Sequence, residues 1–265
     1  MKSLLFIAVV IYVIVASGCF TQEAEGQKAT ASQPPNPVSV DRRPVIVELF
    51  TSEGCSSCPP ADRALKFLAE QQPVRNAEII PLAFHVDYWN YLGWKDRFSS
   101  PAFSRRQEIY VQRFGLDSSY TPEMVIDGQS EFIGSDTGRA SKFITEAASR
   151  NKGNVLAALS NGFINVTVSD LPAHHPSTVF LAVTEDRLTS NVTNGENAGV
   201  TFVHTSVVRS LTSLGLIEKG ANGFQINGTV PEIADLKTDD SRIVVFVQDN
   251  FNRKIIAATV VALSK

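Results

Sequence analysis

The first half of the chain alternates between apolar runs with the spacing of strands and segments with the spacing of helices. Residues 45–50 and 79–86 are rich in β-branched and apolar side chains, which predicts two buried strands. Because one helix is expected between them, we expect the two strands to lie parallel in one sheet. In that intervening segment, 61–71, apolar side chains recur at i, i+3, i+4 and i+7, the spacing of an amphipathic helix, at Ala61, Ala64, Leu65 and Leu68.

Two further helices and a hairpin are predicted in the same half of the chain. Residues 101–114 carry apolar positions suited to a helix, and 138–150 is predicted to close the unit as another helix. The short strand-like runs 124–127 and 131–133 flank a glycine-containing turn, which predicts a β-hairpin. The order of strands and helices therefore predicts an α/β domain over residues 44–152.

After this region the pattern changes to short strand-like runs separated by glycine, asparagine, aspartate and proline. No helical spacing of any length interrupts these runs. About six or seven short strands in roughly 110 residues are typical of two packed β-sheets, so residues 153–265 are predicted to form an all-β sandwich-like domain. The runs are 162–169, 178–185, 201–211, 223–227, 243–249 and 254–262.

The N-terminus has the features of a bacterial export signal. The apolar run 4–16 is shorter than the roughly 20 residues of a membrane span and suits a secretory signal peptide over residues 1–18. The small residues before Cys19 resemble a lipobox, which predicts that Cys19 is the lipidated first residue of the mature protein; an ordinary signal peptide cut nearby is the alternative. Residues 19–43 are polar and contain prolines, which predicts a tether.

The predicted cellular location and the net charge of the protein limit the classes of partner that we expect. Both kinds of signal place the folded part outside the cytoplasm, where disulfides persist. With the lipid, the protein is predicted to be a membrane-anchored lipoprotein that faces the periplasm. The formal net charge is −3 and no basic cluster is present, so we expect no nucleic-acid partner. We also expect no cofactor.

A Cys-x-x-Cys pair, Cys55 and Cys58, follows the strand 45–50, where the next helix is expected to begin. A thiolate near a helix N-terminus is stabilised by free backbone N–H groups and by the helix dipole, which lowers its pKa. The second thiol can close a disulfide with the first, so the pattern predicts a dithiol that cycles between reduced and oxidised forms. A structural disulfide, or part of a zinc site completed by histidines, is the alternative.

Residues at the end of the strand 79–86 are expected near this pair, because the carboxyl ends of parallel strands meet at one edge of a sheet. His85, Asp87 and Trp89 occupy this position. His85 can stabilise a thiolate or carry a proton, since its ordinary pKa is about 6.5. A histidine that is simply hydrogen-bonded at a strand end is the alternative.

A strand, a Cys-x-x-Cys helix start, a parallel strand, the dipeptide Thr121-Pro122 before a hairpin and a final helix together resemble the thioredoxin fold. The resemblance implies that the Thr121-Pro122 bond is cis and that Pro122 lies against the disulfide. It also implies that Glu48 is a buried acid that takes the proton of the resolving thiol, with a raised pKa that suits a base. A solvent-facing strand residue is the alternative for Glu48.

More narrowly, several motifs resemble the secreted thioredoxin-like family labelled domain of unknown function 1223. They are the segments 48–55, 85–89, 92–96 and 120–122. In that family a β domain follows, and its signature is similar to residues Gly195, Glu196, Asn197, His204, Val207, Val208 and Arg209. The resemblance implies a fold and a thiol chemistry, without a known substrate.

These features lead to three hypotheses. The first is an extracytoplasmic thiol–disulfide oxidoreductase, a reductase or isomerase rather than an oxidase, that acts on protein or small-molecule disulfides and exchanges electrons with a redox partner. Cys55 attacks, Cys58 resolves the mixed disulfide, and Pro122 shapes the binding surface. The second is a protein that binds copper or another soft metal through Cys55, Cys58 and His85. The third is a non-catalytic envelope binding module whose β half carries the function.

Overall fold

The first part of the chain forms strands and helices in the order that its pattern predicts. The protein is described by a computed structural model that covers residues 42–263. The predicted signal peptide, Cys19 and nearly all of the predicted tether lie outside these residues. The elements are β1 (Arg43–Thr51), α1 (Pro59–Gln71), β2 (Ala77–His85), the 3-10 helix η1 (Asn90–Leu92), α2 (Pro101–Phe114), β3 (Glu123–Ile126), β4 (Ser130–Ile133) and α3 (Thr137–Ala148).

The second part of the chain, from residue 153, consists of strands and one short 3-10 helix. Within the described residues, no helix of the protein is both long and apolar enough to span a membrane. The elements are β5 (Asn154–Ser160), β6 (Phe163–Ser169), β7 (Ser177–Glu185), β8 (Leu188–Asn191), β9 (Thr201–His204), β10 (Val207–Ile217), β11 (Phe224–Thr229), η2 (Thr238–Asp240), β12 (Ser241–Asp249) and β13 (Ile255–Ala262).

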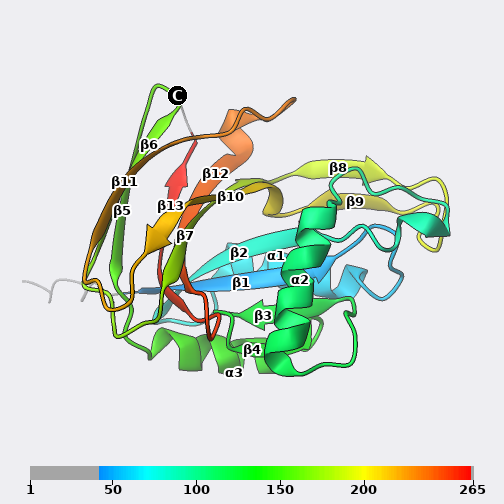
Figure 1. Cartoon of the computed structure of the whole chain (residues 1–265). Coiled ribbons are helices and arrows are strands. Elements are labelled where there is room, and N and C mark those ends of the chain that lie inside the picture. Colours follow the sequence, from blue (N-terminus) through cyan, green and yellow to red (C-terminus); the bar gives the residue numbers. More distant parts are fainter. Residues whose placement is uncertain (1–41, 264–265) are drawn as a thin grey trace, which may run out of the picture. The chain divides into compact units, whose positions relative to one another are not determined.

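A single mixed sheet runs through both parts of the chain, in the order β13-β12-β7-β10-β2-β1-β3-β4 (Figure 1). Strands β1 and β2 pair in parallel, and β3 and β4 form the predicted hairpin. The two parts join where β10 pairs with β2 in parallel, at Val207 opposite Ala83. The fold is therefore a mixed α/β arrangement with one large sheet that continues across the expected boundary near residue 152.

A second sheet, β11-β6-β5, packs against the strands that the second part adds to the large sheet. The two faces of strand β12 pack into two different apolar clusters. Its residues Ile243, Val245 and Val247 lie in the apolar cluster shared with the second sheet, whereas Val244 and Phe246 lie in the cluster beneath α2. The second part thus has the face-to-face packing of a sandwich, but one of its two sheets is an extension of the α/β sheet. The sequence pattern did not predict that continuity.

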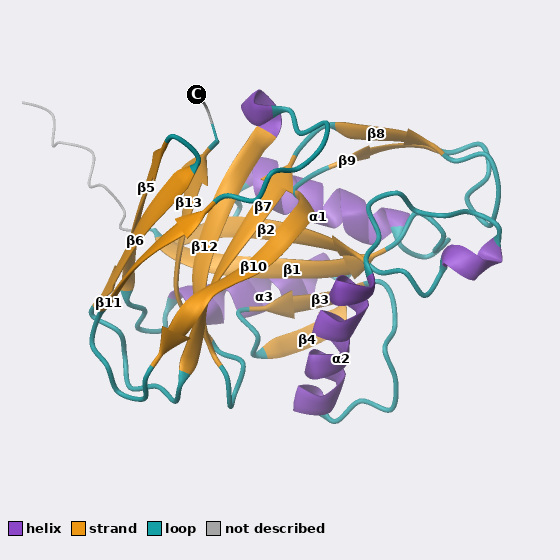
Figure 2. Cartoon of the chain, turned by 45° about the horizontal axis from the view of Figure 1, so that its top comes forward, coloured by secondary structure: helices purple, strands orange, loops and turns teal. Residues whose placement is uncertain are grey.

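Helices cover both faces of the first part of the sheet (Figure 2). On β1, Val45, Val47 and Leu49 face α1 and α3, whereas Ile46 and Phe50 belong to the cluster that contains α2 residues. This alternation follows from the period of two along a strand. Helix α1 begins two residues before the predicted start because proline is compatible with a first helical turn.

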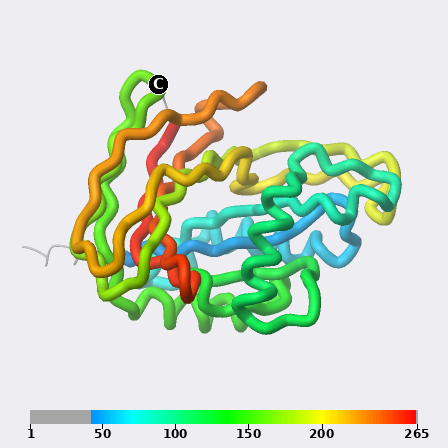
Figure 3. The backbone as a smooth tube through the Cα atoms, viewed as in Figure 1, coloured from blue at the N-terminus to red at the C-terminus, as the bar shows by residue number. Residues whose placement is uncertain are grey.

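Strands β8 and β9 form a separate two-stranded arm that reaches past the large sheet (Figure 3). The predicted run 201–211 is divided into β9 and β10 at Ser206, whose φ is +52° and whose N–H is held by Asp186 at 2.7 Å. The arm lies beside the loop after β2, where Arg97 donates to the carbonyl of Thr189 at 2.9 Å. The division therefore carries β9 away from the large sheet and toward the carboxyl end of β2.

Candidate functional site

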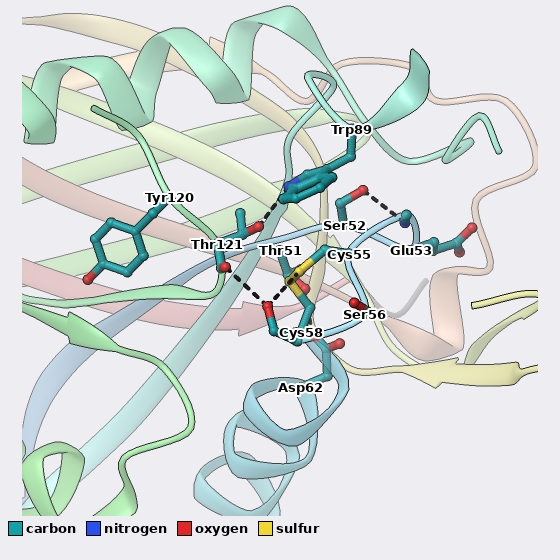
Figure 4. The surroundings of a disulfide bond; sticks show 12 residues. Thr51, Ser52, Glu53, Cys55, Ser56, Cys58, Asp62, Trp89, Tyr120 and Thr121 are labelled. Carbon is teal, nitrogen blue, oxygen red and sulfur yellow. Dashed lines mark hydrogen bonds between the residues drawn. A yellow bond between two sulfur atoms is a disulfide. The ribbon is translucent and has the colours of Figure 1, made fainter. Parts of the chain in front are cut away.

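The predicted disulfide between Cys55 and Cys58 closes the loop between β1 and α1 (Figure 4). The N–H of Cys58 donates to the carbonyl of Cys55, and the carbonyl of Cys58 accepts the first helical bonds from Ala61 and Asp62. Both cysteine side chains are fully buried, although Ser56 and Ser57 between them are exposed. The sulfur atoms therefore lie beneath the loop rather than on the surface.

The cover on one side of the disulfide comes from the loop before β3. The Thr121-Pro122 bond is cis, as the resemblance implied. The hydroxyl of Ser57 lies 3.4 Å from Cys55 Sγ and donates to the carbonyl of Thr121 at 3.4 Å. The indole N–H of Trp89 donates to Thr121 Oγ1 at 2.7 Å. Trp89 and the cis-proline loop are thus linked into one wall beside the sulfur atoms (Figure 4).

A turn from the second part of the chain also holds the cysteine loop. The Asn197 amide donates to the carbonyls of Glu53 and Cys55, at 2.8 and 3.0 Å. The N–H of Ser56 donates to Glu196 Oε2 at 3.1 Å. Gly195 has a φ of +79°, and a Cβ there would lie 3.2 Å from the carbonyl oxygen of Leu92. Residues 195–197 therefore clamp the backbone around Cys55, and a glycine is required to make the turn.

His85 is buried and paired with Asp96. Its Nδ1 donates to Asp96 Oδ2 at 2.6 Å, and the same carboxylate accepts the backbone N–H groups of Glu53 and Phe98. Burial alone would raise the pKa of Asp96, but the neighbouring His85 and these hydrogen bonds lower it to about 2. Burial alone would lower the pKa of His85, but Asp96 raises it. The His85 Nε2 atom is buried and has no hydrogen-bond partner among the described residues.

A second carboxylate–imidazole pair lies next to the first. Glu53 Oε1 accepts from His204 Nε2 at 2.8 Å, and its other oxygen accepts from the Trp94 indole at 2.8 Å. Burial by itself raises the pKa of Glu53, but hydrogen bonds led by the one from His204 lower it overall. The rings of His85 and His204 meet edge to face, with centroids 4.9 Å apart. The second part of the chain therefore supplies one imidazole of this cluster.

Asp62, which the sequence reasoning missed, lies one helical turn after Cys58. Its Oδ1 accepts the Thr51 hydroxyl at 2.9 Å, and burial raises its pKa. Asp62, His85 and His204 line a cavity of about 230 Å³ between α1 and β9. The available signal was the spacing of four residues from Cys58, which places the two side chains on one face of a helix.

Glu48 lies on the other face of the sheet. It is fully buried, and its carboxylate accepts from Arg106 Nη2 at 2.9 Å and from the Tyr110 hydroxyl at 2.5 Å. Both partners belong to α2, whereas the helix that follows the disulfide, α1, covers the opposite face. Glu48 is therefore neither a solvent-facing strand residue nor a free base: a guanidinium holds it as an ion pair. No sequence pattern marked Arg106 as its partner.

The remaining predicted residues divide between the site and its surroundings. Asp87 accepts the Ser104 hydroxyl at 2.5 Å and so ties the end of β2 to α2. Trp89 is partly buried by its contact with Thr121. In the part of the chain that the structure describes, no group of three or more His, Cys, Asp or Glu side chains has an arrangement that can hold a metal ion. The sulfur atoms of Cys55 and Cys58, which the soft-metal hypothesis needs as ligands, are joined to each other in this structure.

One solved structure shares the fold over most of the chain. It is the crystal structure of a protein from Agrobacterium tumefaciens, 24% identical over 83% of this chain and 95% of that one, with a TM-score of 0.67. A domain of the outer membrane lipoprotein Omp28 from Porphyromonas gingivalis matches 42% of this chain and 94% of its own length, at 18% identity and a TM-score of 0.22. A score this low does not indicate a shared fold. No curated protein matches the sequence.

A family profile matches a longer stretch than any single motif. It is described as "Protein of unknown function (DUF1223)" and matches residues 46–248, from β1 into β12. The matched stretch includes the cysteine pair, the cis-proline loop and residues 195–204. These are the segments whose motifs suggested the family and whose side chains meet around the disulfide. The chain therefore belongs to the DUF1223 family of unknown function.

Proposed function

We propose that the protein is a thioredoxin-like thiol–disulfide oxidoreductase. The observation that carries the proposal is the position of the Cys55–Cys58 disulfide: it lies between a central strand and a helix N-terminus, beside a cis-proline loop. Such a position suits a reactive pair, because backbone N–H groups at the start of a helix stabilise a thiolate. The acid and imidazole side chains next to the pair supply groups that can exchange protons.

The reaction is an exchange between two thiols of a substrate and the disulfide of the protein. A substrate thiolate attacks one sulfur of the pair, a new S–S bond forms and the Cys55–Cys58 bond breaks. The second substrate thiol then releases the substrate as a disulfide. Two electrons and two protons are left on the cysteines. The reverse sequence reduces a substrate disulfide, with Cys55 attacking and Cys58 resolving the mixed disulfide. We propose the reductase or isomerase direction.

The proposed setting is the periplasm. A signal peptide over residues 1–18 and a lipid on Cys19 would leave the folded part attached to a membrane by the tether. Its proposed partners are protein or small-molecule disulfides and a second redox protein. Labelling of the protein with a radioactive fatty acid, lost in Cys19→Ala, tests the anchor. An unlabelled wild-type protein found only in the soluble periplasmic fraction would contradict it.

One observation favours a second candidate function, a binding module whose disulfide is structural. Both sulfur atoms are fully buried, as in a structural disulfide of a binding module. The two candidates differ in whether the disulfide exchanges at a useful rate and potential. We therefore propose to equilibrate the purified protein with glutathione buffers and to measure its reduction potential. A value near −270 mV supports a reductase, one near −120 mV an oxidase, and one below about −300 mV a structural disulfide.

Trapping in cells completes the test. Cys58→Ser leaves Cys55 to form mixed disulfides that cannot be resolved, so this variant is expected to capture substrates that a reducing agent releases. The matched control is the double variant Cys55→Ser/Cys58→Ser, which has no attacking thiol. Equal and empty captures by both variants, together with no turnover of a model disulfide, would contradict the proposed function.

A further inference from the structure

Reduction of the buried Cys55–Cys58 disulfide requires the transfer of protons as well as electrons. When the Cys55–Cys58 bond breaks, the sulfur that leaves carries a negative charge until it is protonated. Both cysteine side chains are fully buried, so bulk water does not reach them in this state. A buried, unpaired thiolate is costly, and a nearby group that gives and takes a proton lowers this cost.

Asp62 carries a carboxyl group one helical turn after Cys58. It lies in the first turn of α1, and its backbone N–H donates to the carbonyl of Cys58 at 3.1 Å. Its carboxyl oxygen is fixed by the Thr51 hydroxyl at the end of β1. Figure 4 shows Thr51 and Asp62 among the side chains that surround the disulfide, on the side of Cys58. By contrast, Glu48 is held by Arg106 on the other face of the sheet.

The Asp62 side chain also lines a cavity. Asp62 lines the cavity of about 230 Å³ together with His85 and His204, and the cavity wall opposite α1 is the backbone and side chains of residues 200–205. The titratable groups that act on Asp62 through space are His85 on β2, His204 on β9 and Asp96 in the loop after η1, and two cationic side chains of α1, Arg63 and Lys66, also line the cavity. His85 presents an Nε2 atom that has no partner among the described residues. The cavity is therefore polar where it meets Asp62.

We propose that Asp62 relays protons between the Cys58 sulfur and this cavity, whose outer wall is supplied by the second part of the chain. When the disulfide is reduced, protonated Asp62 gives its proton to the departing Cys58 thiolate and recovers one from the cavity. When Cys58 closes the disulfide again, the Asp62 carboxylate takes the thiol proton before the new S–S bond forms. The relay rests on the proposed function and assigns the β half a place in it.

The test compares Asp62→Asn with Glu70→Gln, an exposed carboxylate on the same helix. The reduced proteins are reoxidised with oxidised glutathione between pH 5 and 9, quenched by alkylation and weighed by mass spectrometry. Asp62→Asn is expected to slow ring closure about 100-fold at pH 7, the lower end of the range for general acid–base catalysis. The deficit should shrink toward pH 9, because the Cys58 thiol then ionises without help. Glu70→Gln should match the wild type throughout.

Two further measurements keep the outcome decisive. Asp62→Glu, which retains a carboxyl group, should restore a pH-dependent rate, as a purely structural role would not require. Thr51→Val should give an intermediate deficit, because it removes only the hydroxyl that fixes Asp62. Wild-type rates and pH profile in folded Asp62→Asn would overturn the relay while leaving the proposed function intact. A wild-type disulfide that glutathione and dithiothreitol cannot reduce would overturn both.

Discussion

Replacing Arg106 with methionine should destabilise the protein strongly, because it leaves a buried carboxylate without its counter-ion. The guanidinium is buried among Phe84, Tyr110, Phe180 and Phe246, with its carbon 5.4–5.5 Å from each ring centroid. It donates two hydrogen bonds to the carboxylate of Glu48, whose side chain is fully buried. Methionine has similar length and helix propensity, so the change removes mainly the charge.

The expected magnitude follows from the burial of both charges. Removing one partner of a buried ion pair costs about 3–5 kcal/mol, because the remaining charge is left in a medium that solvates it poorly. For a folded unit of this size, each kcal/mol lowers the melting temperature by about 2–4 °C, so Arg106→Met should lower it by about 6–20 °C. The neighbouring Arg105 is exposed, and Arg105→Met should change the free energy of unfolding by no more than about 0.5 kcal/mol.

Urea denaturation at pH 7, followed by circular dichroism, measures the free energy of unfolding of the two variants and the wild type. The double variant Glu48→Leu/Arg106→Met removes both charges and should recover most of the loss, since an apolar pair of similar volume can replace a buried ion pair. A loss below about 1 kcal/mol in Arg106→Met, or a double variant no more stable than the single one, would refute this reasoning.

Three other perturbations have definite outcomes. Burial raises the pKa of Glu123 to about 7, so the folded state favours its neutral form; Glu123→Gln should raise the free energy of unfolding by about 1–3 kcal/mol at pH 8 and change it little at pH 5. An equal gain at both pH values would contradict this. The pKa of Asp96 is lowered, so its carboxylate stabilises the folded state fully above about pH 4, and this stabilisation is lost as the pH falls toward 2. In Asp96→Asn, the free energy of unfolding should therefore fall less between about pH 4 and pH 2 than it does in the wild type. Asn197→Ala should speed reduction of the disulfide by a phosphine about 30-fold, because its two hydrogen bonds of about 1 kcal/mol each hold the loop; an unchanged rate would show that the turn does not limit access.

Local patterns were sufficient to predict the elements around the cysteines. The strand β1, the helix α1 and the hairpin after Thr121-Pro122 each depend on residues close in sequence, so spacing and turn composition indicated them. Glu48 was placed in the correct strand. Its partner, however, depends on which face of β1 meets α2, and the period of two does not tell one face from the other until the packing is known.

Contacts between distant segments were beyond this reasoning. The pairing of β10 with β2 joins residues Val207 and Ala83, and the sequence of neither strand indicates that it pairs with the other. The same holds for Asn197 and His204, which reach the loop of Glu53 and Cys55 from the second part of the chain. Those residues were noticed only as part of a family resemblance, and their place beside the cysteines came from the structure.

The clamp on Cys55 also has a consequence for the time at which the cysteine pair becomes enclosed. Asn197 follows Cys55 by 142 residues, so the two hydrogen bonds that close the loop cannot form until most of the chain has been made. At about 5–20 residues per second, this interval is about 7–28 s. During it, Cys55 and Cys58 meet whatever oxidants or thiols surround the growing chain. The cysteine pair is therefore open during this interval to reagents that the finished loop excludes.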